Sequence, residues 1–212
     1  MDCTLCRGKG RSNGCPYCGK DIIVIKVVGF IGNVGAGKTT AANYLVSKGY
    51  IKIRFAEALK KMMIDGLGID KEYVDGSKKN EPCEELCGVT CRIGMITLGT
   101  EWGRHLIHPD LWVVRLSREL CRLIALGECK FVIDDFRFLN EVQWLRRLSV
   151  SSVAPIESCL IRIEREKSEI INHQSETEQK GVEVDFTIDN TRSLDLLHKT
   201  IDVAIEHLFK KE

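Results

Sequence analysis

The feature that most constrains this chain is an eight-residue stretch, Gly32–Thr39, which reads GNVGAGKT. It fits the pattern G-x-x-x-x-G-K-[ST] in full. Its glycines let the backbone approach an anion closely, so that consecutive N–H groups can point at phosphate oxygens. A chance glycine-rich turn is the alternative. Against it, residues 22–31 before the stretch read as a buried, β-branched strand, and a helix pattern follows. The stretch therefore predicts nucleotide binding.

Each residue type in this loop has an expected role in holding ATP. Lys38 would place a positive charge on the β- and γ-phosphates, and the Thr39 hydroxyl would bind Mg²⁺. The helix after the loop presents its N-terminus to the anion. The expected ATP-binding residues are Gly32, Asn33, Val34, Gly35, Ala36, Gly37, Lys38, Thr39 and Thr40.

Length and charge limit the other functions open to the chain. Its 212 residues suit one α/β domain with a small appendage. The 31 Lys and Arg residues nearly balance the 30 Asp and Glu residues, so net charge gives no reason to expect nucleic-acid or membrane binding. No apolar run reaches transmembrane length and no secretory segment is evident, so we expect a soluble, cytoplasmic protein. The sequence says nothing about oligomeric state, and a dimer is possible.

Strand-like and helix-like segments alternate along the chain. Strands are expected at 22–31, 50–55, 130–134, 158–163 and 184–188. Helices are expected from the loop to Gly49, at 56–67, 92–106, 111–126 and 139–148, and after an N-cap at Ser193. Residues 68–90 read as an irregular loop, and 164–180 as a mobile flap. This alternation predicts a three-layer α/β fold, with a central parallel sheet and helices on both faces.

A second candidate site lies in the segment KFVIDDFRFLNE, at 130–141. Two carboxylates, Asp134 and Asp135, end a buried strand, where a phosphate-binding-loop protein holds Mg²⁺ or orients its acceptor. Arg137 could bind a phosphate through two hydrogen bonds. The alternative is an ordinary helix N-terminus with Asp near its start. The phosphate-binding loop in the same chain favours the functional interpretation.

Several arginines recur where phosphoryl transfer would need positive charge. Arg92 and Arg104 flank GMITLGTEWG, and Arg162 and Arg165 open the polar flap. Phosphoryl transfer demands little covalent chemistry of the protein, so positive charge around the transferring group is the main requirement. Any single arginine is more often a solvated surface residue, so the set carries more weight than its members. The expected catalytic residues are Lys38, Asp135, Arg137 and Arg162.

The chain resembles the deoxynucleoside monophosphate kinases of tailed bacteriophages over about residues 25–208. The resemblance is carried by GNVGAGKTTAA at the loop, FAEALKK at 55–61, RIGMITLGTEWGRHLIHPDLW at 92–112, VIDDFRFLNE at 132–141, HQSE at 173–176 and DFTIDN at 185–190. Several separated motifs in one order are more specific than the loop alone. The resemblance implies the fold of the P-loop nucleoside monophosphate kinases, with a sheet core, an acceptor-binding helical region and a lid at about 164–180.

The resemblance also implies an activity and a set of acceptor contacts. The γ-phosphoryl group of ATP would pass to a deoxynucleoside monophosphate and give the diphosphate. The implied acceptor-binding residues are Lys60, Arg92, Gly99, Thr100, Trp112, Asp135, Arg137 and Glu141. Lys60 and Arg92 would lie near the acceptor phosphate, whereas His173, Ser175 and Glu176 would lie in the lid without an assigned role. Trp112 has two interpretations: it could stack on the base of the acceptor, or it could pack as an aromatic side chain in the core.

The first 21 residues form a separate, cysteine-rich head that departs from this family. The sequence has ten cysteines, and Cys3-x-x-Cys6 and Cys15-x-x-Cys18 form two close pairs around a glycine-bearing loop. Four thiolates at this spacing suit tetrahedral Zn²⁺, and the head has too little apolar material to fold without metal. We therefore expect a structural zinc knuckle in residues 1–21 and a kinase domain in 22–212. The alternative is a disordered, reduced tail.

Three further cysteines, Cys83, Cys87 and Cys91, recur every four residues. This spacing would align them on one helix, but Pro82 and Gly88 argue against a regular helix there. No fourth ligand is evident, so we expect incidental thiols.

Two other functions compete with the deoxynucleotide kinase. One is a related P-loop kinase with another acceptor, such as dephospho-coenzyme A. The other is an ATP-dependent module that binds nucleic acid or protein through the zinc head. The segments GTEWGR and DDFRFLNE favour the deoxynucleotide acceptor, and the small net charge of the head weakens the binding-module hypothesis.

Overall fold

The computed structural model describes residues 23–148, 155–165 and 181–209. The chain divides into two compact units. Among the described residues, the sheet unit comprises 23–53, 122–148, 155–165 and 181–209, and the helical unit comprises Arg54–Cys121. The cysteine-rich head and residues 166–180 of the expected flap, including His173, Ser175 and Glu176, lie outside the described residues.

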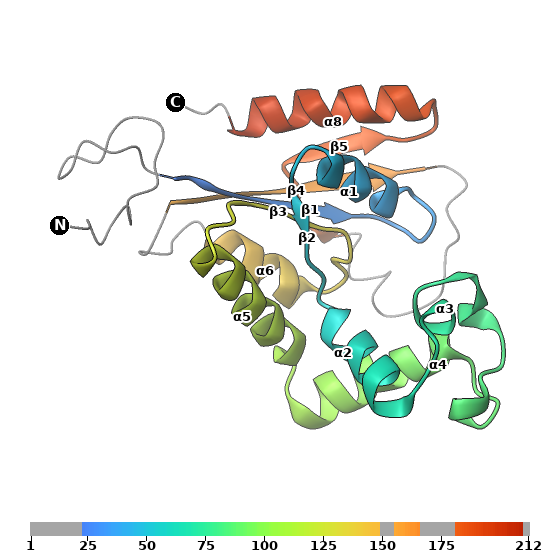
Figure 1. Cartoon of the computed structure of the whole chain (residues 1–212). Coiled ribbons are helices and arrows are strands. Elements are labelled where there is room, and N and C mark those ends of the chain that lie inside the picture. Colours follow the sequence, from blue (N-terminus) through green and yellow to red (C-terminus); the bar gives the residue numbers. More distant parts are fainter. Residues whose placement is uncertain (1–22, 149–154, 166–180, 210–212) are drawn as a thin grey trace, which may run out of the picture. The chain divides into compact units, whose positions relative to one another are not determined.

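Five parallel strands form the sheet of the sheet unit (Figure 1). They are β1 (Ile25–Ile31), β2 (Ile51–Lys52), β3 (Lys130–Ile133), β4 (Ile156–Glu164) and β5 (Phe186–Asp189). Their order across the sheet is β2-β3-β1-β4-β5. The central strand β1 is almost entirely buried, as a run of apolar, β-branched residues requires. The predicted parallel sheet is therefore confirmed.

Helices cover both faces of this sheet. Helices α1 (Lys38–Ser47) and α8 (Leu194–Phe209) lie on one face, and α6 (Leu139–Leu148) lies on the other (Figure 1). On the α1 and α8 side, Val28 and Phe30 of β1 are completely buried in the main core cluster. Side chains alternate along a strand, so neighbouring residues of β1 face α6. The described part of the sheet unit thus has the predicted three-layer α/β architecture.

Gly29 shows why the core needs a glycine within β1. A Cβ atom at this position would lie 2.6 Å from the Phe136 ring and 2.9 Å from Leu160. Phe136, from the DDFRF segment, is fully buried against this gap. The packing therefore links the first strand to the segment that follows β3.

The helical unit consists of short helices in sequence. They are α2 (Glu57–Lys61), a π-helical turn (Met62–Gly66), α3 (Lys71–Val74), 3₁₀ turns at Ser77–Asn80 and Glu84–Leu86, α4 (Cys91–Ile96), a π-helical segment (Thr97–Ile107) and α5 (Leu111–Ala125), which continues into the sheet unit. The prediction of an irregular loop at 68–90 is therefore wrong. Asp70 caps α3 by accepting the Glu72 N–H at 2.7 Å, and Glu72 accepts the Ser77 N–H at 2.8 Å. These polar residues order the segment instead of leaving it irregular.

Other expected elements differ mainly at their ends. The strand expected at 50–55 shortens to β2, because the chain passes into the helical unit at Arg54. Cys83 and Cys91 are buried, whereas Cys87 is exposed in a left-handed conformation with φ of 53°. The three cysteines therefore do not share a helix, as expected from Pro82 and Gly88. Within the described residues, no helix is both long and apolar enough to span a membrane.

Candidate active site

The phosphate-binding loop connects β1 to α1 and is shaped by three glycines. Gly32, Gly35 and Gly37 have φ angles of 145°, 79° and 105°, which side chains with a Cβ atom rarely adopt. Parallel strands bring their carboxyl ends to one edge of a sheet, and the loop begins at that edge of the central strand. The predicted loop therefore has both the backbone shape and the position of an anion site.

Two of these glycines are also required by their neighbours. A Cβ atom at Gly32 would lie 2.2 Å from the Ile163 carbonyl oxygen of β4. At Gly37 it would lie 2.3 Å from Nδ2 of Asn190, whose side chain donates a hydrogen bond of 2.8 Å to the Ala36 carbonyl. Asn190 directly follows β5, so the far strand of the sheet braces the loop. No local pattern in the sequence predicts this role of Asn190.

Lys38 holds its positive charge at the loop. Its ammonium donates hydrogen bonds to the Gly32 carbonyl at 2.5 Å and the Asn33 carbonyl at 2.7 Å. Helix α1 begins after Gly37 with no side-chain cap and no acidic residue in its first turn, so its N-terminal N–H groups favour an anion. Thr39 and Thr40 are exposed at this helix start. These features suit the phosphates of a nucleotide.

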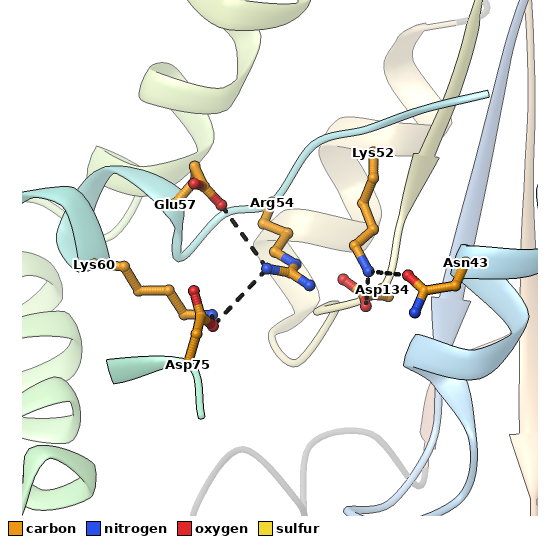
Figure 2. A network of polar contacts seen from close by, with 7 residues as sticks. All are labelled: Asn43, Lys52, Arg54, Glu57, Lys60, Asp75 and Asp134. Atoms are coloured by element: carbon orange, nitrogen blue, oxygen red, sulfur yellow. Dashed lines mark hydrogen bonds and ion pairs between the residues drawn. The ribbon is translucent and has the colours of Figure 1, made fainter. Parts of the chain in front are cut away.

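A buried carboxylate lies at the end of β3, which neighbours β1 in the sheet. Asp134 is 5% exposed, and its Oδ2 lies 3.2 Å from the ammonium of Lys52 on β2 (Figure 2). The Lys52 ammonium also donates to Oδ1 of Asn43 on α1 at 2.8 Å. A buried carboxylate needs such a partner, because desolvation of the charge is otherwise expensive. Asp134 belongs to the predicted acidic pair, whereas Lys52 reads in the sequence as an ordinary strand residue and was not predicted.

The rest of the DDFRFLNE segment leads into α6. Asp135 is partly buried and Arg137 is exposed. Glu141 is 1% exposed and accepts the backbone N–H groups of Arg137 at 2.7 Å and Phe138 at 3.1 Å. These contacts give Glu141 a structural role at the start of α6, in the manner of a capping box. Acceptor contacts of Asp135, Arg137 and Glu141 stay predictions.

Arg162 lies on β4 beside the start of the loop. Its register partner on β1 is Ile31, the residue before Gly32. Its guanidinium donates a hydrogen bond of 2.8 Å to the Val182 carbonyl. The pairing of β4 with β1 therefore places Arg162 beside the start of the loop. Its contribution to catalysis stays a prediction.

In the helical unit, two predicted acceptor residues contact each other. The Trp112 indole N–H donates to the Gly99 carbonyl at 2.7 Å, and Trp112 is 3% exposed. A Cβ atom at Gly103 would lie 2.7 Å from the Trp112 ring. Trp112 therefore packs as an aromatic side chain in the core, which was the alternative to stacking on a base. Thr100 follows Gly99 in the π-helical segment and is partly buried.

The helical unit also contains a cluster of basic side chains, here termed the cation cluster: Arg54, Lys60, Lys79 and Arg92. Asp75 lies 2.5 Å from the Lys60 ammonium and 3.9 Å from the Arg54 guanidinium (Figure 2). Burial, together with the charge of Lys60, lowers the pKa of Lys79. Lys60 and Arg92 were expected from the family resemblance. Arg54 was missed because it read as a strand residue, and Asp75 and Lys79 were missed because 68–90 read as an irregular loop.

The predicted site residues therefore divide between the two units. The loop, Asp135, Arg137, Glu141 and Arg162 belong to the sheet unit, and Lys60, Arg92, Gly99, Thr100 and Trp112 belong to the helical unit. Among the described residues, no group of three or more His, Cys, Asp or Glu side chains could hold a metal ion by itself. Cys3, Cys6, Cys15 and Cys18 are outside that part of the chain.

Two sequence relatives have similar coverage and identity. A protein of Acanthamoeba polyphaga mimivirus described as "Putative deoxynucleotide monophosphate kinase" is 26% identical over 200 residues, covering 85% of this chain and 96% of the relative. A dephospho-CoA kinase of Trichormus variabilis is 27% identical over 207 residues, with the same two coverages. No protein-family model matches the chain.

Solved structures resemble the chain more distantly. A dephospho-CoA kinase from Campylobacter jejuni is 13% identical, covers 87% of this chain and 98% of that protein, and has a TM-score of 0.49. The sequence relatives and the phosphate-binding loop at the edge of a parallel sheet place this chain in the P-loop kinase superfamily, as an ATP-dependent small-molecule phosphotransferase.

Proposed function

We propose that this protein transfers the γ-phosphoryl group of ATP to a deoxynucleoside monophosphate. The observation that carries the proposal is the geometry of Gly32–Thr39, in which glycines at positive φ and the Lys38 ammonium form an anion site before α1. This geometry supports binding of the ATP phosphates. The similarity to the mimivirus protein supports the deoxynucleotide acceptor.

Magnesium fits the oxygen ligands near the loop. The Thr39 hydroxyl at the start of α1 and the Asp134 carboxylate at the end of β3 would hold the ion, since Mg²⁺ prefers oxygen ligands and keeps several waters. When bound, Mg²⁺ neutralises charge on the β- and γ-phosphates. In this scheme, Lys52 orients the Asp134 carboxylate while Lys38 contacts the phosphates.

The acceptor chemistry is supported by the cation cluster of the helical unit. An acceptor phosphate and the γ-phosphate of ATP repel each other, so an enzyme that joins them must surround the acceptor with positive charge. Arg54, Lys60, Lys79 and Arg92 provide such an environment within one unit. We propose that Arg137 and Arg162 contribute further charge at the sheet unit, and that residues 164–180 act as a lid that excludes water.

A dephospho-coenzyme A acceptor is the second candidate, because one relative bears that name at 27% identity. The two candidates differ in the attacking atom. A deoxynucleoside monophosphate attacks through a phosphate oxygen, whereas dephospho-coenzyme A attacks through a sugar hydroxyl that needs a general base. The basic side chains gathered in the cation cluster favour the phosphate acceptor.

A coupled ADP-release assay tests the proposal. It would use ATP and Mg²⁺ with each of the four deoxynucleoside monophosphates, with dephospho-coenzyme A, and with no acceptor. We expect ADP release that depends on at least one deoxynucleotide. Release only with dephospho-coenzyme A would move the assignment to the second candidate. Release without any acceptor, or none at all, would contradict both and favour the ATP-dependent binding module.

For the head, we propose a structural Zn²⁺ held by Cys3, Cys6, Cys15 and Cys18, supported by their spacing. Zinc content of the purified protein should be about one equivalent, consistent with one four-thiolate site. A Cys15→Ser, Cys18→Ser variant should lose it and retain most kinase activity. If that variant lost turnover while its core stayed folded, the head would have to belong to the active site.

A further inference from the structure

The peptide between Ala36 and Gly37 can offer an anion at the loop either a donor or an acceptor. A trans peptide carries its N–H and its carbonyl on opposite sides. Helix α1 makes its first hydrogen bond from the Ala41 N–H to the Gly37 carbonyl, at 3.0 Å. The N–H groups of its first turn therefore have no partner within the helix, and the Gly37 N–H comes directly before them in the chain. The orientation of this one peptide thus decides whether the Gly37 N–H joins the anion site.

Gly37 does not select this orientation by itself. Its φ and ψ angles are 105° and 13°. Turning the peptide over would bring φ to about −75°, in a region that is allowed for every residue. A glycine adopts both values at little cost, because it has no Cβ atom. Another group must therefore hold the orientation that the structure has.

The side chain of Asn190 supplies that restraint. Its amide donates a hydrogen bond of 2.8 Å to the Ala36 carbonyl, which fixes the carbonyl on the Asn190 side of the peptide. The Gly37 N–H then points to the opposite side. The same amide nitrogen would lie 2.3 Å from a Cβ atom at Gly37, so Asn190 packs directly against the peptide that it holds. Its position and its hydrogen bond both depend on the glycine.

The sheet holds Asn190 itself in place. Strand β5 pairs with β4, and directly after β5 the Asn190 N–H donates to the Glu164 carbonyl at 2.8 Å. The next N–H, of Thr191, donates to Oδ1 of Asp189 at 3.0 Å, which fixes the turn after the strand. Asn190 is partly buried and Ala36 is 1% exposed, so water competes little for the hydrogen bond between them. The restraint on the loop is therefore anchored in the sheet.

We propose that Asn190 is a positioning residue for the phosphates of ATP: it keeps the Ala36–Gly37 peptide in the orientation that presents the Gly37 N–H to them. The proposal rests on nucleotide binding at the loop, which the proposed function also requires, but not on the identity of the acceptor. Without the Asn190 amide, the loop divides between two peptide orientations. Affinity then falls in proportion to the fraction that stays competent to bind. In the other orientation, the Ala36 carbonyl oxygen faces the phosphates and repels them.

Equilibrium binding to the full chain tests this role. Isothermal titration calorimetry would measure ATP and inorganic tripolyphosphate, each with Mg²⁺, because tripolyphosphate offers the phosphates without a base or a sugar. Asn190→Ala removes the donor and should weaken both ligands by about three- to tenfold, the effect of one lost hydrogen bond. Asn190→Asp keeps the side-chain shape but places a negative charge beside the Ala36 carbonyl. It should weaken both ligands by more than about tenfold.

Ser193→Ala is the matched control. Ser193 lies in the same connection between β5 and α8, and its hydroxyl accepts the Leu196 N–H at 3.3 Å. The variant also loses one side-chain hydrogen bond, but not one to the loop, so both ligands should bind within about twofold of the unmodified chain. Circular dichroism and thermal unfolding should show that all three variants fold. A merely structural role of Asn190 would lower thermal stability and leave tripolyphosphate binding unchanged.

The outcomes separate this inference from the proposed function. Weaker binding of both ligands to both Asn190 variants, with the control unchanged, would support the inference. Weaker binding of ATP alone would overturn it, because Asn190 would then act through the base or the sugar. Unchanged binding in both variants, or an equal loss in Ser193→Ala, would also overturn it.

Two further results bear on the proposed function. If the unmodified chain bound neither ligand, the inference and the ATP-dependent function would fall together. If the expected shifts appeared and no deoxynucleotide were phosphorylated in the ADP-release assay, the role of Asn190 would stand and the proposed acceptor would fail.

Discussion

The phosphate-binding loop and the cation cluster bring positive charge together in opposite ways. The loop depends on backbone geometry: three glycines at positive φ, a Lys38 ammonium on two carbonyls, and a brace from Asn190. The cluster depends on side chains from several short segments, and two of them, Lys60 and Arg54, contact the Asp75 carboxylate. A backbone site is rigid and tolerates few substitutions, whereas a side-chain site can exchange partners. Under the proposed function, the rigid loop would bind ATP and the more adaptable cluster would bind the acceptor.

The largest expected effect tests whether the loop acts through charge as well as shape. Lys38→Ala should reduce phosphoryl transfer about a thousandfold or more, because it removes positive charge from the β- and γ-phosphates. Stability should change little, since the Lys38 contacts go to loop carbonyls at a partly exposed site. Steady-state kinetics and thermal unfolding measure the two effects. Near-normal turnover would refute the role of the loop.

The next effect concerns the buried pair beside the loop. Lys52→Met would leave the Asp134 carboxylate, only 3% exposed, without its ion-pair partner Lys52, and should lower the free energy of unfolding by about 3–5 kcal/mol. Lys48→Met is the control, because the Lys48 and Asp202 side chains are 51% and 47% exposed and their pair should contribute under about 1 kcal/mol. Urea unfolding compares them. Equal losses would mean that burial of Asp134 does not matter.

A glycine pair tests the dependence of the loop on its backbone. Gly32→Ala combines a positive φ with a contact of 2.2 Å to the Ile163 carbonyl, and should cost about 3 kcal/mol or more. Gly35→Ala has a positive φ but meets no atom within 4 Å, and should cost only about 1 kcal/mol. ATP affinity should fall more in Gly32→Ala. If both variants bound ATP normally, ATP binding would not depend on the backbone geometry of the loop, and the contrast between the loop and the cation cluster would fail.

The smallest effect tests whether the segment 68–90 is firmly packed. Burial and a hydrogen bond to Glu85 raise the pKa of the Cys83 thiol to about 11, whereas Cys87 is exposed. At pH 8.5, iodoacetamide should therefore alkylate Cys87 at least tenfold faster than Cys83, because the thiolate is the reactive form. Peptide mass spectrometry resolves the two sites. Equal rates would show that this segment opens readily.

The sequence by itself determined the α/β class, the parallel sheet and the position of the phosphate-binding loop. These features are local. Runs of β-branched residues form buried strands, and three glycines near Lys38 allow the positive φ angles that the loop needs. The sequence also determined the Ser193 cap, since its hydroxyl accepts the Leu196 N–H at 3.3 Å.

Only the tertiary structure decided which side chains meet. Lys52 reaches Asp134 because β2 and β3 are neighbours in the sheet, although the two residues are 82 positions apart in the sequence. Trp112 packs against Gly99 and Gly103 of the π-helical segment, and Glu141 turns inward to the start of α6. Asp75 and Lys79 lie near Lys60 and Arg54 only because short helices fold the polar stretch 68–90 back on itself. Such contacts depend on chain reversals and packing, which no local pattern of residues encodes.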